Sequence, residues 1–170
     1  RPRAIGDKEH RRATDVAAGA ISPQKLYGTP VGLMFYEGAP RLMRSGVSVP
    51  LLQAGDPRRV ALETYPGMLA RQLVGRRSYK QDALARQSAH QRAAREEMLR
   101  EIRAAGSAVG AFEVDAPDDL AVDPGADHLD ALLCAIQAAW AYSQRTRGYG
   151  IPGNADPLEG WIVQPGPVTG

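Results

Sequence analysis

The chain has 170 residues, of which 44% are hydrophobic and 6% aromatic, and this composition suits one globular domain with an aliphatic core. No run approaches the roughly 20 consecutive apolar residues of a membrane-spanning helix, so we expect no membrane segment. The net charge of +2 is unevenly spread: residues 71–106 hold nine Lys or Arg against four acids, and residues 107–170 hold two against nine. This layout fits a polyanion bound beside metal-binding carboxylates, and it also fits two solvated helix faces.

The single cysteine and the start of the sequence bear on the cellular setting. Cys134 excludes an internal disulfide, and its apolar helical surroundings favour a small core residue. We therefore expect a reducing compartment, the cytoplasm. The sequence opens at Arg1 with a charged run and no convincing first strand, so we also expect an upstream segment.

The first third of the chain predicts two helices and a short strand. Residues 7–19 read as a short polar helix that ends at a glycine. Residues 30–45 follow a Thr-Pro start signal and have helical spacing interrupted by Pro40, so we predict a broken or kinked helix, with a strand over 31–36 as the alternative. Residues 47–49 predict a short strand.

The remainder alternates between strand and helix patterns. Residues 59–64 hold a continuous Val-Ala-Leu run, which is typical of a strand buried on both faces of a parallel sheet. Further helices are predicted over 68–74, 81–105 and 126–146, and further strands over 111–115 and 160–163. The helix over 126–146 is nearly free of charge, so we expect it to be buried on most sides against a sheet. Alternating strands and helices indicate an α/β protein.

Three carboxylates stand where apolar neighbours usually exclude charge. Glu63 ends the apolar strand, and the carboxyl ends of strands face the ligand crevice of open α/β sheets. Asp127 and Asp130 lie three residues apart, and therefore on one face, in the first turn of the helix over 126–146. Such acids suit Mg²⁺ or Mn²⁺, which prefer oxygen ligands. The alternative is structural: Asp127 as a helix cap, and Glu63 paired with Arg59 or Arg71.

Other polar residues carry weaker signals. Tyr79 and Lys80 place a phenol and an ammonium where they suit a phosphate group, and with Arg77 they are the predicted substrate-binding residues. His128 lies between the two aspartates, within reach of a metal bound there, although a lone histidine more often makes a structural hydrogen bond. The sequence has no phosphate-binding glycine loop, zinc-spaced Cys/His set or nucleophilic serine elbow.

Several short segments together resemble the domain-of-unknown-function family 429, whose members are described as ribonuclease H-like nucleases. Each segment is weak by itself, and their order and spacing over most of the chain make the set moderately specific. The segments are Arg12-Ala13-Thr14-Asp15, Glu63-Thr64-Tyr65-Pro66, Ser78-Tyr79-Lys80, Asp127-His128-Leu129-Asp130-Ala131-Leu132-Leu133-Cys134-Ala135 and Glu159-Gly160-Trp161-Ile162-Val163.

The resemblance implies a ribonuclease H-like fold, a mixed sheet flanked by helices with acids gathered around divalent metal. Residues 1–170 would then form a single domain, the carboxy-terminal two-thirds of such a fold without its amino-terminal strands. By the same resemblance Glu63, Asp127 and Asp130 are the catalytic and metal-binding acids. Arg12 and Glu159 are their supporting partners, and Asp15 helps to order the site.

The expected function is therefore divalent-metal-dependent hydrolysis of phosphodiester bonds in a nucleic acid. The first alternative is a module of the same fold that binds nucleic acid or a nucleotide without cutting it. The second is a regulatory or assembly protein that uses the apolar helix or a sheet edge for a partner. Fold-level analogy does not decide among the three.

Overall fold

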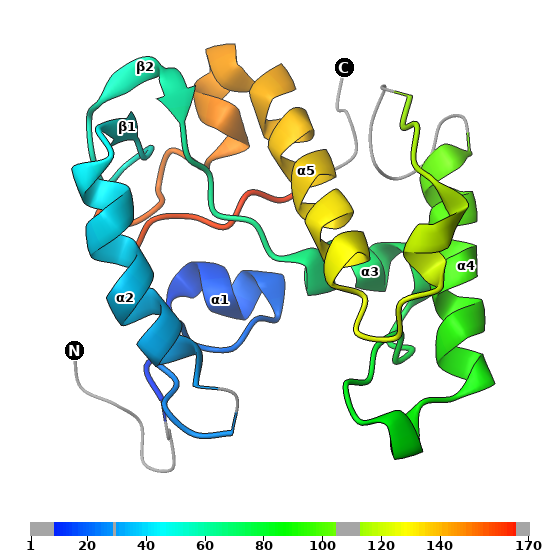
Figure 1. Cartoon of the computed structure of the whole chain (residues 1–170). Helices are drawn as coiled ribbons and strands as arrows, with labels where there is room; N and C mark the ends of the chain where they lie inside the picture. Colours follow the sequence, from blue (N-terminus) through cyan, green and yellow to red (C-terminus); the bar gives the residue numbers. More distant parts are fainter. Residues whose placement is uncertain (1–8, 29, 105–112, 166–170) are drawn as a thin grey trace. The chain divides into compact units, whose positions relative to one another are not determined.

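A computed structural model of the chain describes residues 9–28, 30–104 and 113–165 (Figure 1). Its contacts divide into two compact units. Unit 1 comprises Arg1–Glu63 and Ile151–Ile162, and unit 2 comprises Thr64–Gly150 and Val163–Gly170. Both helices and a small parallel sheet are present, so the chain is mixed α and β. The prediction of one domain over the whole chain stays a prediction.

Unit 1 holds α1 (Ala13–Ala18), α2 (Val31–Arg44), β1 (Val47–Ser48) and β2 (Asp56–Val60). The two strands are parallel neighbours, and β1 confirms the short strand predicted over 47–49. Gly55 immediately precedes β2 and lies against the β1 backbone, since a Cβ atom at this position would be 2.5 Å from the Gly46 and Val47 carbonyl oxygens. The close approach of these two backbones therefore requires glycine here.

The returning carboxy-terminal stretch completes unit 1. Ile162 forms an isolated parallel bridge with Glu63, and Figure 1 shows the red stretch running beside the green stretch. The backbone N–H of Ile162 also donates to the buried Thr14 hydroxyl at 2.8 Å, which attaches this stretch to α1. Trp161 is the tryptophan of this unit. The predicted strand over 160–163 is thus reduced to a single bridge within the described residues.

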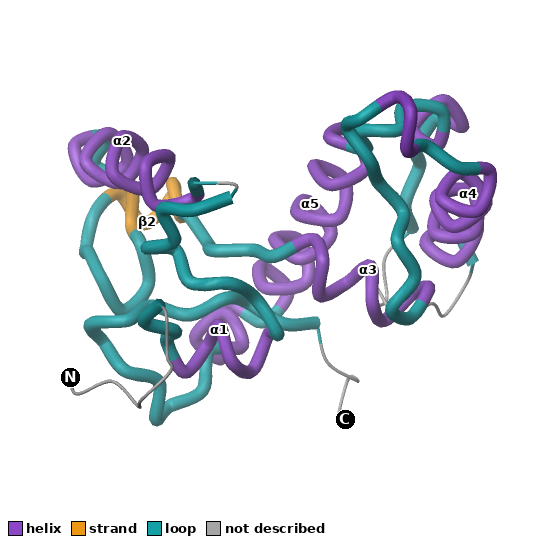
Figure 2. Tube along the Cα trace, turned by 90° about the horizontal axis from the view of Figure 1, so that it is seen from below, coloured by secondary structure: helices purple, strands orange, loops and turns teal. Residues whose placement is uncertain are grey.

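Two predictions for unit 1 were wrong in part. The strand over 59–64 was expected to be buried on both faces, but β2 ends at Val60 and is exposed at Pro57, Arg58 and Arg59. The apolar run Val60-Ala61-Leu62 was interpreted as part of a buried strand. Only Val60 belongs to β2, and Ala61 and Leu62 lie in an irregular, half-buried segment. The helix predicted over 30–45 is present as α2, but it runs without a break through Pro40 to Arg44, and the alternative strand over 31–36 was wrong. Figure 2 shows the two strands lying beside this helix.

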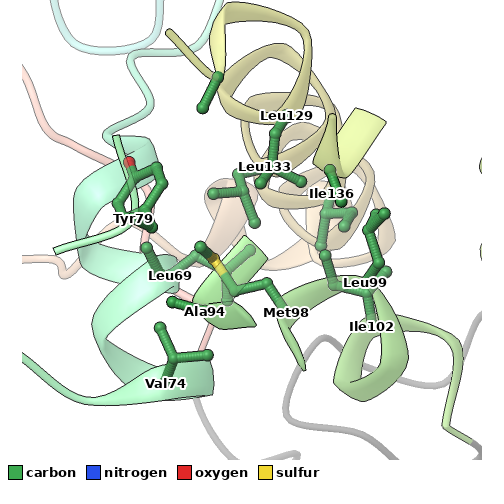
Figure 3. Close-up of a cluster of buried hydrophobic side chains, with 13 residues drawn as sticks. Leu69, Val74, Tyr79, Ala94, Met98, Leu99, Ile102, Leu129, Leu133 and Ile136 are labelled. Atoms are coloured by element: carbon green, nitrogen blue, oxygen red, sulfur yellow. The ribbon is translucent and has the colours of Figure 1, made fainter. Parts of the chain in front are cut away.

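Unit 2 is helical and contains the main hydrophobic core. Its helices are α3 (Pro66–Val74), α4 (Ala89–Arg103) and α5 (Asp127–Ser143), with 3-10 turns η1 (Leu84–Arg86), η2 (Asp118–Ala121) and η3 (Arg145–Gly150). α3 contacts both α4 and α5, while η2 contacts α4 and α5. Figure 3 shows the labelled core side chains that meet between these helices: Leu69, Val74, Tyr79, Ala94, Met98, Leu99, Ile102, Leu129, Leu133 and Ile136. Burying one such leucine completely contributes about 1.5–3 kcal/mol.

The helix boundaries in unit 2 follow local signals. Pro66 is the first residue of α3 and Gly75 follows its end, which confirms the predicted helix over 68–74 and adds two residues. α4 starts at Ala89 rather than at residue 81, because Ser88 caps it and forms a reciprocal capping box with Gln91. α5 confirms the predicted helix in existence and position.

The expected surroundings of α5 were wrong. Within unit 2 it packs on α3, η2 and η3, which are helical, and Ala131, Ala135 and Ala139 are exposed. Cys134 is half-buried on this helix with a free thiol. Residues 113–115 contain no strand, and the rest of the strand predicted over 111–115 lies outside the described residues. Among the helices that the structure describes, none combines the length and apolar character needed to cross a bilayer.

Candidate functional site

In unit 1, Arg12 holds several acids of the motif segments together. Its Nη1 and Nη2 atoms donate to the two Glu63 carboxylate oxygens at 2.8 and 2.5 Å. Its Nε and Nη2 atoms donate to the two Asp15 oxygens at 3.1 and 2.7 Å, and Nη1 also donates to the Glu159 carbonyl at 3.0 Å. These contacts use all five N–H groups of the guanidinium. We call Arg12, Asp15, Glu63 and Glu159 the Arg12 cluster.

The Arg12 cluster is built by α1 and the returning carboxy-terminal stretch. Asp15 is fully buried at the third position of α1, where its carboxylate also accepts from the Arg12 backbone N–H at 2.8 Å. The Glu159 carboxylate accepts from the Ala13 backbone N–H at 2.9 Å, and His10 Nε2 lies 3.7 Å from its other oxygen. Burial works to lower the pKa of Arg12, but the hydrogen bonds and charges of Glu63 and Asp15 outweigh it and raise the pKa above its ordinary value.

In unit 2, Asp130 is the acceptor of a second cluster. The Tyr79 hydroxyl donates to its Oδ1 at 2.7 Å, and Lys80 Nζ donates to its Oδ2 at 2.5 Å. The Asp130 side chain is 16% exposed and that of Lys80 is 48% exposed, so the pair lies at the border of core and solvent. Burial and then the Asp130 hydrogen bond raise the pKa of Tyr79, which keeps the phenol protonated as a donor. We call these three residues the Asp130 cluster.

A buried arginine holds the Tyr79-Lys80 turn in place. Arg95 on α4 is 3% exposed and donates to the Tyr79 carbonyl at 2.7 Å and the Ala121 carbonyl at 2.8 Å. Burial lowers its pKa. The residue went unnoticed in the sequence, although a charge among the apolar positions of α4, next to Ala94 and Met98, was a usable signal.

A buried glutamine does the same for the Glu63-Thr64-Tyr65-Pro66 segment. Gln137 on α5 is fully buried, and its side-chain amide accepts from the Tyr65 N–H and donates to the Tyr65 carbonyl, both at 2.8 Å. It thereby pairs with this backbone as a neighbouring strand would. Gln137 was not predicted from the sequence either, although a polar residue among the buried apolar positions Leu133, Ile136 and Ala141 of α5 was a usable signal.

A comparison with protein-family models gives the identity of this set of segments. The model described as "Protein of unknown function (DUF429)" matches residues 8–156. The chain belongs to the DUF429 family. No match was found among curated proteins or among solved structures. The family resemblance is therefore confirmed, with four of the five motif segments inside the matched residues and Glu159-Gly160-Trp161-Ile162-Val163 outside them. Its ribonuclease H-like part stays a prediction.

The predicted site residues of this DUF429 protein fall in both units. Tyr79 and Lys80 meet Asp130 as one cluster, although the segments are about 50 residues apart in the chain. Arg77 does not join them, because it forms an exposed ion pair with Glu97 at 2.5 and 2.8 Å. The hydrogen bonds that Arg77 donates to the Glu97 carboxylate raise the pKa of Arg77.

The three predicted acids differ in their surroundings. Glu63 lies in unit 1 and its ion-pair partner is Arg12 rather than Arg59, which donates to a backbone carbonyl instead. Asp127 is exposed, and Ala126 rather than Asp127 occupies the N-cap position of α5. His128 is exposed as well. The predicted meeting of Glu63 with the aspartates of unit 2 stays a prediction.

Neither unit by itself fits a divalent metal ion as its side chains stand. In the part of the chain that the structure describes, no group of three or more His, Cys, Asp or Glu is arranged to hold an ion. Both oxygens of Glu63 accept from Arg12, and both oxygens of Asp130 accept from Tyr79 and Lys80. An ion would have to displace these donors, and nearby positive charge opposes its approach.

Proposed function

We propose that this DUF429 chain belongs to a nuclease that hydrolyses phosphodiester bonds and depends on a divalent metal. The observation that carries the proposal is the Asp130 cluster, in which residues of two separate motif segments bring a carboxylate, a phenol and an ammonium together. A carboxylate beside a displaceable ammonium suits a phosphodiester, since the ammonium can bind the phosphate while the acid is released for its chemistry. The ribonuclease H-like fold is part of the same proposal.

The proposed catalytic acids are Glu63, Asp127 and Asp130, with Lys80 and Tyr79 as substrate-binding groups. Lys80 is half exposed on a flexible stem, so a phosphate oxygen can replace Asp130 as its partner. Tyr79 is buried and keeps Asp130 oriented during that exchange. Arg77 is left out of the proposal because Glu97 already neutralises it. The expected cofactor is Mg²⁺ or Mn²⁺, for which these three acids would supply oxygen ligands.

A cleavage assay tests the proposal. Purified protein is incubated with labelled single-stranded, duplex and branched DNA and RNA, in Mn²⁺, in Mg²⁺ or in EDTA. We expect cleavage that requires the metal, and a fall of about 100-fold or more in Asp130→Asn, the scale seen when one charge-stabilising group is removed from an active site. Asp115→Asn is the matched control, because Asp115 is an exposed acid of the same unit. A panel that remains intact in both metals refutes the proposal.

A second function, binding of nucleic acid without cleavage, is favoured by a different observation: Glu63 and Asp130 are already paired with cations. Since Glu63 and Asp130 are already paired with cations, the exposed basic residues between α3 and α4 are the groups open to a polyanion. They include Arg76 and Arg86. A binding module predicts salt-sensitive association with nucleic acid that persists in Asp130→Asn. Fluorescence anisotropy at several salt concentrations separates this function from hydrolysis.

The expected cellular setting belongs to the proposal as well. A cytoplasmic location agrees with the free thiol of Cys134, because thiols stay reduced there. Nucleic acid is the proposed partner.

A further inference from the structure

The helix α2 carries an unusual amount of apolar surface in contact with solvent. Gly32 is its one buried residue, and no other helix or strand in the described part of the chain packs extensively against it. Exposed apolar patches rimmed by polar residues mark interaction surfaces on soluble proteins. The large hydrophobic side chains of this helix are 41–74% exposed: Leu33, Met34, Phe35, Tyr36, Leu42 and Met43.

The apolar residues of α2 form two separate rows. Phe35, Ala39 and Leu42 make one row, which faces the interior of unit 1, where these residues line a cavity. The second row lies on the opposite side of the helix, and its members are exposed and do not line that cavity. Spacings of three, four and three residues are those of a seam along which two helices pack. We call this second row the α2 stripe: Leu33, Tyr36, Pro40 and Met43.

One flank of the α2 stripe is charged, and its pattern is complementary to itself. Glu37 and Arg44 each directly follow a residue of the stripe and are seven residues apart, so they lie on the same flank. When two identical helices pack antiparallel about a two-fold axis, this flank of one helix meets the same flank of the other. Glu37 of each copy then faces Arg44 of the other. The present partner of Glu37 is Arg41, and this exposed ion pair of 3.4 Å is weak enough to be exchanged.

We propose that α2 pairs with α2 of a second copy of this chain in an antiparallel dimer with two-fold symmetry. Tyr36 and Pro40 lie at the centre of the interface, and Leu33 of each copy packs on Met43 of the other at its two ends. The charged flank fixes the antiparallel direction, because in a parallel pair it would meet the uncharged Gly32 and Ala39 instead. The inference is independent of the proposed function, since none of the proposed catalytic or substrate-binding residues lies on α2.

The size of α2 sets the strength that we expect of this dimer. Its 14 residues span about 21 Å. A covered aromatic side chain buries about 150–250 Å², and Tyr36, which is 74% exposed, is therefore the largest single contributor. One helix pair still buries less than the standard total of about 1,200–2,000 Å². We therefore expect a reversible dimer with a Kd of about 10–100 µM.

Sedimentation equilibrium of the whole chain tests for this dimer. Over about 10–500 µM protein we expect the average mass to rise from that of one chain toward that of two. The measurement is made in EDTA and without nucleic acid, so a failed cleavage assay leaves it intact. A chain that stays monomeric at about 500 µM overturns the proposal.

Two serine variants locate the interface. Tyr36→Ser removes the largest side chain of the α2 stripe, and we expect the dimer affinity to fall about tenfold or more. Tyr142→Ser is the matched control, because Tyr142 is a similarly exposed tyrosine, at 61%, in unit 2. This control should dimerise as the wild type does. Equal affinity of the two variants overturns the proposal.

Reversal of the charged flank tests the antiparallel direction. Glu37→Arg makes the flank wholly basic, and the double variant Arg41→Glu, Arg44→Glu makes it wholly acidic. We expect each variant alone to dimerise about tenfold more weakly or worse, because like charges then meet across the interface. An equimolar mixture of the two should regain at least the wild-type affinity. A mixture that stays monomeric, or a variant that dimerises as well as the wild type, overturns the proposal.

Circular dichroism shows whether the flank variants keep their helix content. If either variant loses helix, the comparison of Tyr36→Ser with Tyr142→Ser decides the question, since it leaves the charges of α2 unchanged.

Discussion

Replacing Arg12 with methionine should destabilise unit 1 strongly, because it leaves the buried Asp15 carboxylate without its positively charged partner. Asp15 is 1% exposed and receives three of its hydrogen bonds from Arg12, two from the guanidinium and one from the backbone. Breaking a buried pair by removing one partner costs about 3–5 kcal/mol. Glu63 adds little to this figure, since its side chain is 40% exposed and water replaces the lost donors. We expect Arg12→Met to lower the free energy of unfolding by about 3–5 kcal/mol.

Tryptophan fluorescence measures this effect in the right place. Trp161 lies in unit 1 and Trp140 in unit 2, so urea unfolding of a Trp140→Phe background reports on unit 1. Arg41→Met is the matched control: its ion pair with Glu37 is exposed on α2, and such pairs contribute about 0–1 kcal/mol.

The pH dependence gives a further check on the same variant. Because the pKa of Arg12 is raised above its ordinary value, its contribution is fully present below that value and is lost only when the pH rises through the folded pKa. The difference between wild type and Arg12→Met should therefore stay constant between about pH 7 and about pH 9. A loss below about 1 kcal/mol, similar to that of the control, would refute the view that Arg12 neutralises a buried acid.

Four other predictions concern single side chains. Asp130→Asn should lower the pKa of Tyr79, because the Asp130 hydrogen bond and charge add to burial in raising it, and ultraviolet titration of the phenol will show whether it does. Gly55→Ala should destabilise unit 1 by about 1–3 kcal/mol through overlap with the β1 backbone, whereas Gly38→Ala should stabilise α2 by up to about 1 kcal/mol; chemical denaturation compares them. Gln137→Leu should cost about 2–4 kcal/mol in a thermal or urea melt, since it leaves a backbone N–H and a carbonyl without partners.

Local signals in the sequence predicted the parts of the fold that local physics determines. The helices predicted over 68–74 and 126–146 and the short strand predicted over 47–49 all appear where they were expected. The start of α4 was misplaced because the apolar periodicity was followed further than the Ser88 cap allows. The exposure of β2 was not predicted, since an apolar run does not indicate whether other strands cover it.

The site was predictable as a set of residues and not as a set of contacts. Tyr79, Lys80 and Asp130 were all chosen as functional groups, yet they were assigned to substrate and metal separately, whereas they bind one another. The ion pair of Glu63 with Arg12 joins residues 51 positions apart, and no periodicity links them. Pairings at such separations depend on packing, which one sequence does not state.

The same contacts define what activation of the proposed nuclease requires. An acid that is paired with a cation has its charge neutralised. Glu63 and Asp130 must therefore each lose this partner before they act in the proposed reaction. Lys80 is the more readily displaced partner, since it makes one hydrogen bond from a half-exposed ammonium. Arg12 is held through five. A polyanion that binds Lys80 therefore frees Asp130 first, while Glu63 remains fixed by Arg12. Removing the ammonium in Lys80→Met should therefore free the Asp130 oxygen that Lys80 now occupies, without a polyanion.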